Sequence, residues 1–128
     1  MTHKIQDIGV AKHIGLYSDA IESTAGLRWL HTSGTPGLMD SGDIPTDIES
    51  QSALACQHIL AMLKRADMST ADLVKISQYL TRAEDIAPYL RVRSEVLGDV
   101  RPAGLLLIVS QLIRPEVLVE IEVIAARR

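Results

Sequence analysis

An almost wholly apolar segment near the C-terminus constrains the fold more than any other part of this sequence. Residues 104–112 read GLLLIVSQL. The uninterrupted apolar run within it, 105–109, is far too short to cross a bilayer as a helix. Such a run is typical of a strand that is buried on both faces. The fold must therefore place a packing layer on each side of this strand.

The remaining pattern predicts a single α+β domain that spans residues 1–128, with the element order ββαβαββ. Residues 33–45 are rich in Gly and Pro and are expected to form a loop. Residues 1–13 are weakly patterned, and we expect this segment to be partly mobile. Strands are predicted over residues 15–21, 27–32, 73–80, 104–112 and 117–126, and helices over 46–66 and 88–97. The first two strands are expected to form a hairpin.

Capping patterns and breaker residues set the predicted helix ends. The pattern T-x-x-E, in which Ser or Thr and Glu satisfy each other's backbone N–H groups, occurs at Thr46 with Glu49 and at Thr81 with Glu84. Pro88 lies too deep for a helix that begins at the second pattern, so we expect a turn over 82–87 and a helix from Pro88. Gly98 is expected to end that helix.

Two helices can cover one face of the predicted sheet but cannot easily cover both. The apolar strand then needs a second packing layer on the other face of the sheet. Another subunit is the simplest source of this layer, since an exposed apolar sheet face of this size would promote association. The pattern therefore predicts an oligomer.

Composition and charge exclude several classes of partner. The net charge is −3, aromatic residues make up 3% of the chain and there is no Phe. Neither a basic stripe for phosphates nor an aromatic platform for bases is present, which argues against nucleic acid as a partner. The first residues lack the apolar core of a signal peptide and no segment could span a membrane, so we expect a cytoplasmic protein.

The sequence predicts no metal site and no cofactor. The histidines His3, His13, His31 and His58 have no metal-ligand spacing, and no glycine-rich phosphate-binding motif is present. The single cysteine, Cys56, is expected to be a small buried apolar residue rather than a nucleophile, because nothing near it would activate a thiolate. Trp29 is expected in the core or at an interface.

Four short motifs, in this order and spacing, resemble those of the RidA family, also called YjgF or endoribonuclease L-PSP. They are I-G-L-Y at 14–17, T-S-G at 32–34, P-A-G-L-L at 102–106 and V-E-I-E-V-I-A at 119–125. The resemblance covers about residues 14–128. It implies a chorismate-mutase-like fold and a homotrimer whose sheets pack into a central barrel, with the helices outside and ligand clefts between subunits. This packing would supply the second layer that the apolar strand requires.

Enzymes of this family hydrolyse 2-imino or 2-enamino acids to 2-oxo acids and ammonia. Their P-A-R motif carries an arginine that binds the substrate carboxylate, and a guanidinium suits such bidentate contacts. Here Gly104 occupies that position, and Leu106 stands where a cysteine is common. The cleft is therefore expected to be roomier and less cationic, which argues against the standard deaminase activity.

The resemblance assigns roles to three other residues. Glu120 would orient or activate water, and Tyr17 and Ser33 would line the substrate cleft. From the residues alone, the preferred interpretation of Glu120 and Glu122 is a pair of solvated or inter-subunit charges on one face of a strand. Ser33 could equally be a turn residue, and Tyr17 an ordinary half-buried tyrosine.

Four arginines are candidates to replace the missing cation: Arg91, Arg93, Arg101 and Arg114. Arg91 is a substrate-binding candidate because it lies where relatives of the family often have an asparagine close to the cleft, and Arg101 lies just before the turn at 102–104, so either could reach the cleft. Each could also be a surface arginine paired with a nearby carboxylate, and the sequence does not choose among them.

Three functions remain open. The first is hydrolysis of an imine, enamine or related C–N bond in an unusual substrate, with Glu120 positioning water. The second is a non-catalytic trimer that binds a small metabolite between its subunits. The third, ribonuclease activity, is suggested only by the older family name and is disfavoured by the acidic balance of the chain.

Overall fold

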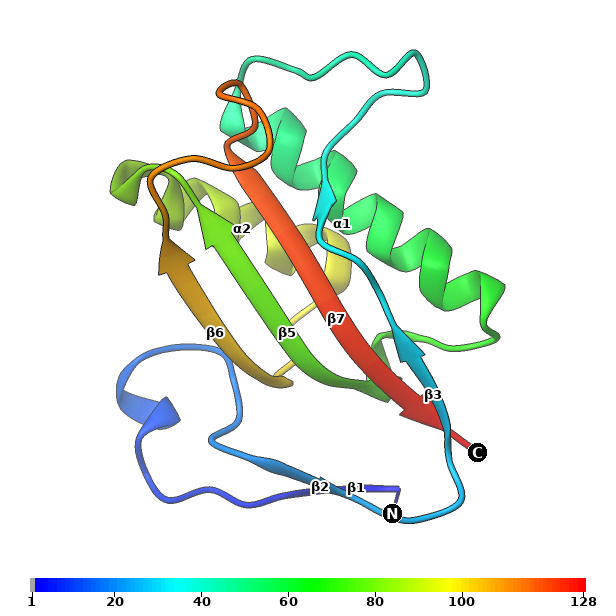
Figure 1. Cartoon of the computed structure of the whole chain (residues 1–128). Helices are drawn as coiled ribbons and strands as arrows, with labels where there is room; N and C mark the ends of the chain where they lie inside the picture. The colour runs from blue at the N-terminus through cyan, green and yellow to red at the C-terminus, as the bar shows by residue number, and fades with distance from the viewer. Residues whose placement is uncertain (1) are drawn as a thin grey trace.

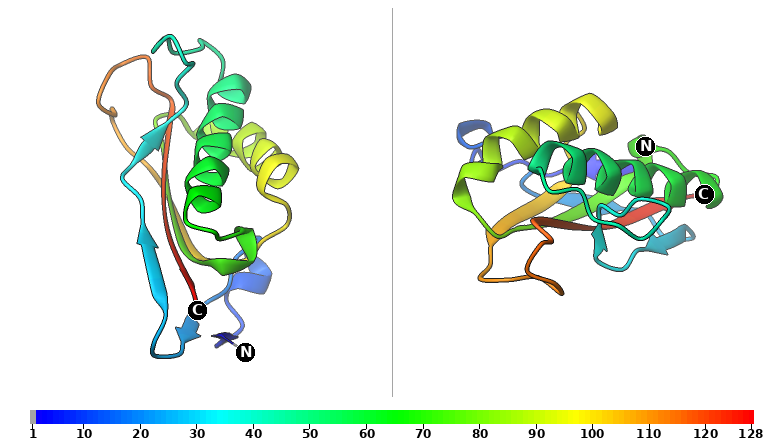
Figure 2. Two further views of the ribbon diagram at one scale, coloured as in Figure 1. Left: turned by 90° about the vertical axis from the view of Figure 1, so that its right-hand side faces the viewer. Right: turned by 90° about the horizontal axis from the view of Figure 1, so that it is seen from above.

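A computed structural model describes residues 2–128 as two layers, a mixed sheet with two helices on one of its faces (Figures 1 and 2). The main sheet runs in the order β3 (Arg28–His31), β7 (Val119–Arg127), β5 (Leu73–Leu80) and β6 (Ala103–Ile108). The short strand β4 (Thr35–Pro36) also pairs with β7. The pairs within it are antiparallel except β5 with β6, which are parallel and are joined through a helix. The predicted α+β class with two helices on one face is confirmed.

The core lies between the two helices and the inner face of β5 and β7. Alternate residues of β7, among them Val119, Ile121 and Val123, point inward and are almost fully buried. They pack against the buried side of helix α1 (Ile48–Arg65), which includes Ala55 and Ile59. The two-residue period of the strand and the 3.6-residue period of the helix each place apolar side chains on one face, and the two faces pack together in this cluster.

The N-cap of helix α1 lies one residue later than the sequence pattern indicates. Its N-cap is Asp47, whose carboxylate accepts a hydrogen bond of 2.8 Å from the backbone N–H of Ser50. This contact lowers the pKa of the Asp47 carboxyl. The predicted capping box of Thr46 and Glu49 is therefore wrong, because the adjacent aspartate competes for the same role.

Helix α2 (Ile86–Leu97) begins two residues before Pro88, the predicted first position. A proline in the first turn is tolerated because the N–H that it lacks would have no partner inside the helix. Thr81 and Glu84 form no capping box; instead a single turn of 3₁₀ helix, η3 (Ala83–Asp85), precedes α2. As predicted, the helix ends at Gly98, whose positive φ of 80° favours glycine.

The N-terminal part of the chain differs from the prediction. Residues 15–20 form no strand, and the strand β2 (Ile21–Ser23) pairs with β1 (His3–Ile5) in a separate two-stranded sheet. The predicted hairpin with residues 27–32 is therefore wrong, and β3 pairs with β7 instead. Between β1 and β2, where a 3₁₀ turn η1 (Ala11–His13) forms, the Asp19 carboxylate accepts backbone hydrogen bonds from Ile8, Val10 and Ala11. These bonds lower the pKa of Asp19 and fold the segment into a loop that has no periodic signal.

Strand β6 is shorter than predicted and lies at the edge of the sheet. Leu106 faces the helices, whereas Leu105 and Leu107 face away from them and are 37% and 49% exposed. Burial on both faces is thus not achieved within one chain. The opposite face of the sheet is open, and Trp29 and His31 of β3 lie on it, 6.4 Å apart between ring centroids.

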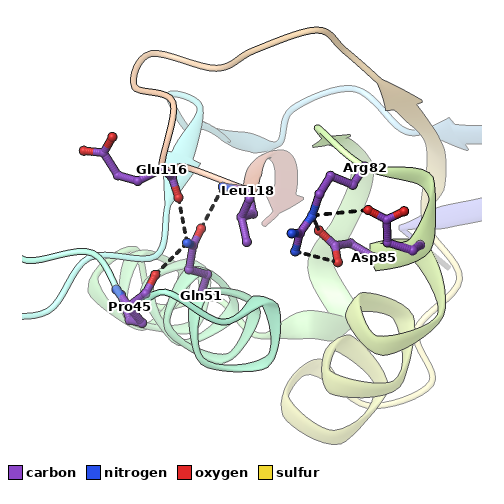
Figure 3. A network of polar contacts seen from close by, with 7 residues as sticks. Pro45, Gln51, Arg82, Asp85, Glu116 and Leu118 are labelled. Carbon is purple, nitrogen blue, oxygen red and sulfur yellow. Dashed lines mark hydrogen bonds and ion pairs between the residues drawn. The ribbon is translucent and has the colours of Figure 1, made fainter.

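The side chain of Gln51 connects α1 to two loops, as Figure 3 shows. It is fully buried, and its amide donates to the carbonyl oxygens of Pro45 at 2.7 Å and Glu116 at 2.9 Å. Its own oxygen accepts from the N–H of Leu118 at 2.8 Å. The same view contains the ion pair of Arg82 with the buried Asp85, which stabilises the start of α2.

We predict that Gln51→Met lowers the free energy of unfolding by about 2–3 kcal/mol, because buried backbone groups lose their partners. Gln57→Met is the matched control, since Gln57 is exposed on the same helix, and its effect should stay within about 0.5 kcal/mol. Urea unfolding followed by circular dichroism at one protein concentration measures both variants. Equal effects of the two substitutions would contradict this role for Gln51.

Candidate functional site

A cavity of about 420 Å³ lies between helix α2, the inner face of β5 and β6, and residues 14–17. Its volume is within the range of small-molecule pockets, roughly 300–1,000 Å³. Most of its wall is apolar, and the polar lining side chains come from Tyr17, Gln78, Arg93 and Ser94. Its apolar lining residues are Ile14, Leu16, Ile86, Leu90, Val100 and Leu106.

Hydrogen bonds to the start of β6 hold one wall of the cavity in place. The hydroxyl of Ser18 donates to the carbonyl oxygen of Arg101 at 2.5 Å, and the Ser18 N–H donates to that of Pro102 at 3.2 Å. Ser18 also forms an isolated bridge with Ala103. These contacts place the neighbouring Tyr17 beside β6, so that two predicted site residues, Tyr17 and Leu106, line the same cavity.

Arg93 is the cation of this cavity. It lies on α2, is only 6% exposed and lines the cavity. Its Nη1 donates to Gln78 Oε1 at 2.8 Å, and its Nη2 donates to the carbonyl oxygens of Leu16 at 3.4 Å and Val100 at 3.3 Å. The sequence named Arg93 as one of four arginines but did not select it. A signal exists in the helical period, since Arg93 lies one turn from both Tyr89 and Leu97, which are buried.

Gln78 organises the polar end of the cavity. Its oxygen accepts from Arg93 and also from the hydroxyl of Tyr89 at 2.5 Å, while its amide donates to the carbonyl oxygen of Leu105 at 2.9 Å. Burial raises the pKa of the Tyr89 hydroxyl, which therefore stays protonated as the donor. The sequence prediction missed both Gln78 and Tyr89, because an isolated buried polar residue in a strand or helix carries no motif.

The other candidate arginines lie elsewhere. The side chain of Arg91 is 59% exposed and lies 3.9 Å from Glu49 of α1, and it does not line this cavity. This is the surface ion pair that the sequence left open as an alternative. Arg101 borders two smaller depressions, one beside residues 5–19 and one beside residues 70–73, and Arg114 is exposed in the loop between β6 and β7.

Gly104 packs closely against β5. A Cβ atom built there would lie 3.0 Å from both Cγ2 and the carbonyl oxygen of Ile76. At Gly104 the backbone of β6 therefore lies close to its neighbour β5.

Neither Glu120 nor Ser33 lines this cavity within one chain. Glu120 lies on the open face of β7, in register with Tyr79 of β5 and Pro36 of β4. The turn over 32–34 is fixed to β7, since Thr32 Oγ1 accepts from the N–H of Val123 at 2.9 Å. Gly34 lies directly against the Glu120 carboxylate, where a Cβ would be only 2.5 Å from Oε2.

Other kinds of chemistry find little support in residues 2–128. No group of three His, Cys, Asp or Glu side chains there is placed to hold a metal ion. Cys56 is fully buried, as expected, and burial raises the pKa of its thiol to about 12. Within the same residues, no helix is both long and apolar enough to cross a membrane.

We predict that Cys56 of the native protein resists thiol reagents near neutral pH. A rise in pKa from the ordinary 9.0 to about 12 lowers the reactive thiolate fraction by about a thousandfold, in addition to the steric block of burial. Labelling with a chromogenic disulfide should become fast once the chain is unfolded in guanidinium chloride. Fast labelling of the native protein would contradict the burial of this thiol.

Comparison with known proteins identifies the family to which this chain is similar. The family model described as Endoribonuclease L-PSP matches residues 9–127. A RutC family protein of Pyrococcus abyssi is 35% identical over 116 residues, which cover 89% of this chain and 88% of the relative. TdcF of Escherichia coli, provisionally named a reactive intermediate deaminase, is 29% identical over 100 residues, or 75% of this chain and 77% of TdcF.

Solved structures agree with the fold. A Rid family protein of Yersinia pestis superposes with a TM-score of 0.84 at 23% identity, covering 99% of this chain and 100% of the other. TdcF of Escherichia coli, crystallised with bound serine, gives a TM-score of 0.71 at 26% identity, with 90% and 91% of the two chains covered.

Proposed function

Because this chain belongs to the endoribonuclease L-PSP family, which is also the RidA family, we propose that it is a homotrimer that hydrolyses a small imine or enamine. The reacting bond would be C=N or a related C–N bond, and the site would lie where two subunits meet. A relative provisionally named as a reactive intermediate deaminase supports this class of reaction. The fold similarity to TdcF with bound serine supports a site for a small amino-acid-like ligand.

The observation that carries the proposal is that the ligand cavity and the Glu120 carboxylate lie apart on one chain, so that neither forms a complete site alone. The cavity near Tyr17 and Leu106 has polar donors but no carboxylate among its lining residues. Glu120, with Gly34 beside it, has a carboxylate but does not line this cavity. A neighbouring subunit could place its Glu120 group at this cavity and so complete both.

The open sheet face supports the assembly. It carries Trp29 of β3 and Leu105 and Leu107 of β6, each more than a third exposed. Apolar side chains gathered on one sheet face favour contact with another sheet, as in the barrel that the family resemblance implies.

The chemistry needs a positioned water and two proton transfers. Water adds to the imine carbon while a base takes its proton, which gives a carbinolamine. The carbinolamine then releases ammonia and leaves a carbonyl group, so that one imine and one water yield one 2-oxo product and one ammonia. In this proposal the Glu120 carboxylate orients the water and accepts its proton.

We expect Glu120→Gln to lower kcat by about 100-fold or more, the usual contribution of a general base. Glu122→Gln is the matched control, two residues along the same strand face, and should keep its activity. 2-Iminopropionate, formed in the assay by an amino-acid oxidase, serves as the first substrate, and lactate dehydrogenase detects the pyruvate. Because Gly104 replaces the arginine, we expect a lower kcat/KM than that of an arginine-bearing relative.

Equal loss of activity in both glutamate variants would argue against a chemical role for Glu120. Wild-type activity equal to that of an arginine-bearing relative would show that Gly104 does not limit the reaction.

Light scattering tests the assembly, and we expect a mass of three times the 14.0 kDa chain. Leu107→Glu should shift the protein towards monomer, since a charge on an apolar contact face is costly to bury. Ile113→Glu, in the loop after β6 where Ile113 is 79% exposed, should leave the trimer intact. A monomeric wild-type protein would contradict the inter-subunit site.

A non-catalytic role is the second candidate, and the apolar character of the cavity favours it. Such a protein would bind a small metabolite in the same cleft without converting it. Tight binding of the product-like 2-oxo acid, combined with no hydrolysis of any imine tested, would favour this role over catalysis.

A further inference from the structure

We propose that Arg93 replaces the missing strand arginine and binds the carboxylate of a ligand whose hydrocarbon part fills the apolar cavity. The ligand class is a small carboxylic acid with a branched aliphatic chain. That it is a 2-imino acid or its 2-oxo product rests on the proposed function, but binding of the carboxylate does not.

The first argument is charge. Arg93 is 94% buried, and none of the ion pairs within residues 2–128 includes it. Its three hydrogen-bond partners are the neutral oxygens of Gln78, Leu16 and Val100. A buried charge is usually paired, because removing an ion from water is expensive. The guanidinium therefore lacks the anion that such a site normally contains.

The second argument is the number of donors. A guanidinium carries five N–H groups, and the contacts to Gln78, Leu16 and Val100 use three of them. Two of the three are long, at 3.3 and 3.4 Å, so they hold the group weakly. The remaining N–H groups belong to Nε and Nη1, so in this proposal a bidentate carboxylate takes one of them and displaces one of the long Nη2 contacts.

The third argument is the wall around this charge. Six apolar side chains line the cavity, from α2, β6 and the segments next to them. A polar or doubly charged ligand would leave its own groups without partners there. A carboxylate at the Arg93 end with an aliphatic chain along Leu90, Val100 and Leu106 would satisfy both parts of the cavity.

This inference changes the consequence of Gly104. The cation is supplied from helix α2 and not from strand β6. The carboxylate of the ligand would therefore bind nearer to α2 than it would to an arginine at position 104. Short 2-imino acids that suit an arginine on the strand would then be poor ligands, because they would leave the apolar wall unfilled, while longer branched ones would fill it.

Isothermal titration calorimetry on the wild-type protein gives the first test. The probe is 4-methyl-2-oxopentanoate, and its primary amide is the neutral match. We expect the amide to bind about 30-fold more weakly or worse, as expected when a buried charge loses its partner. Pyruvate, which lacks the branched chain, should bind about tenfold more weakly or worse. Acid and amide of equal affinity would overturn the proposal without any mutation.

Variants give the second test. Arg93→Gln should weaken binding of the acid by about 30-fold or more and leave binding of the amide little changed. Arg93→Lys keeps the charge without the planar fork and should recover part of the affinity. Arg65→Gln, at the exposed end of α1, is the control for loss of one positive charge and should bind as wild type. If Arg91→Gln abolishes binding while Arg93→Gln does not, the assignment to Arg93 is wrong.

The outcomes separate this inference from the proposed function. Binding that depends on Arg93, together with no hydrolysis of the corresponding imine, would support the carboxylate site and argue against catalysis. Hydrolysis with a KM that Arg93→Gln leaves unchanged would support catalysis and overturn the role of Arg93. Glu120→Gln should retain the wild-type affinity for the 2-oxo acid if both proposals hold.

Discussion

The hydrogen bonds of the Arg93 guanidinium join parts of the chain that are far apart in sequence. They connect α2 to the loop at Leu16, to the connection at Val100 and, through Gln78, to the centre of the sheet. Each of these partners also borders the cavity, so this one side chain links several of its walls. Tyr89 and Gln78 complete the set, so the buried charge is surrounded by fixed dipoles and not by a second charge.

Much of the fold could be predicted from the sequence because its central elements are periodic. Strand β5 has the predicted bounds, and the ends of α1 and β7 lie within about two residues of prediction, the usual uncertainty of such boundaries. The N-terminal region could not be predicted in the same way. Its shape depends on the Asp19 carboxylate, which binds backbone groups eight to eleven residues earlier, and such contacts leave no repeating pattern.

The site could be predicted only in part. Two residues named from the motifs, Tyr17 and Leu106, line one cavity, because Ser18, next to Tyr17, pairs with the start of β6. The choice among four arginines required knowing which face of α2 packs against the sheet. Arg93 faces inward on the side of Tyr89, whereas Arg91 points towards solvent and Glu49.

Strand β6 links the ligand cavity to the proposed assembly. Leu106 lines the cavity on one face of the strand, and Leu105 and Leu107 are exposed to solvent on the other. A strand at the edge of a sheet with one uncovered apolar face gains much of its order from whatever covers it. If a neighbouring subunit covers that face, it fixes the position of Leu106 and of the Leu105 carbonyl that holds Gln78. Assembly would then tighten the polar end of the cavity before any ligand arrives. A cation that is already desolvated and held by neutral dipoles would leave little reorganisation for the incoming carboxylate.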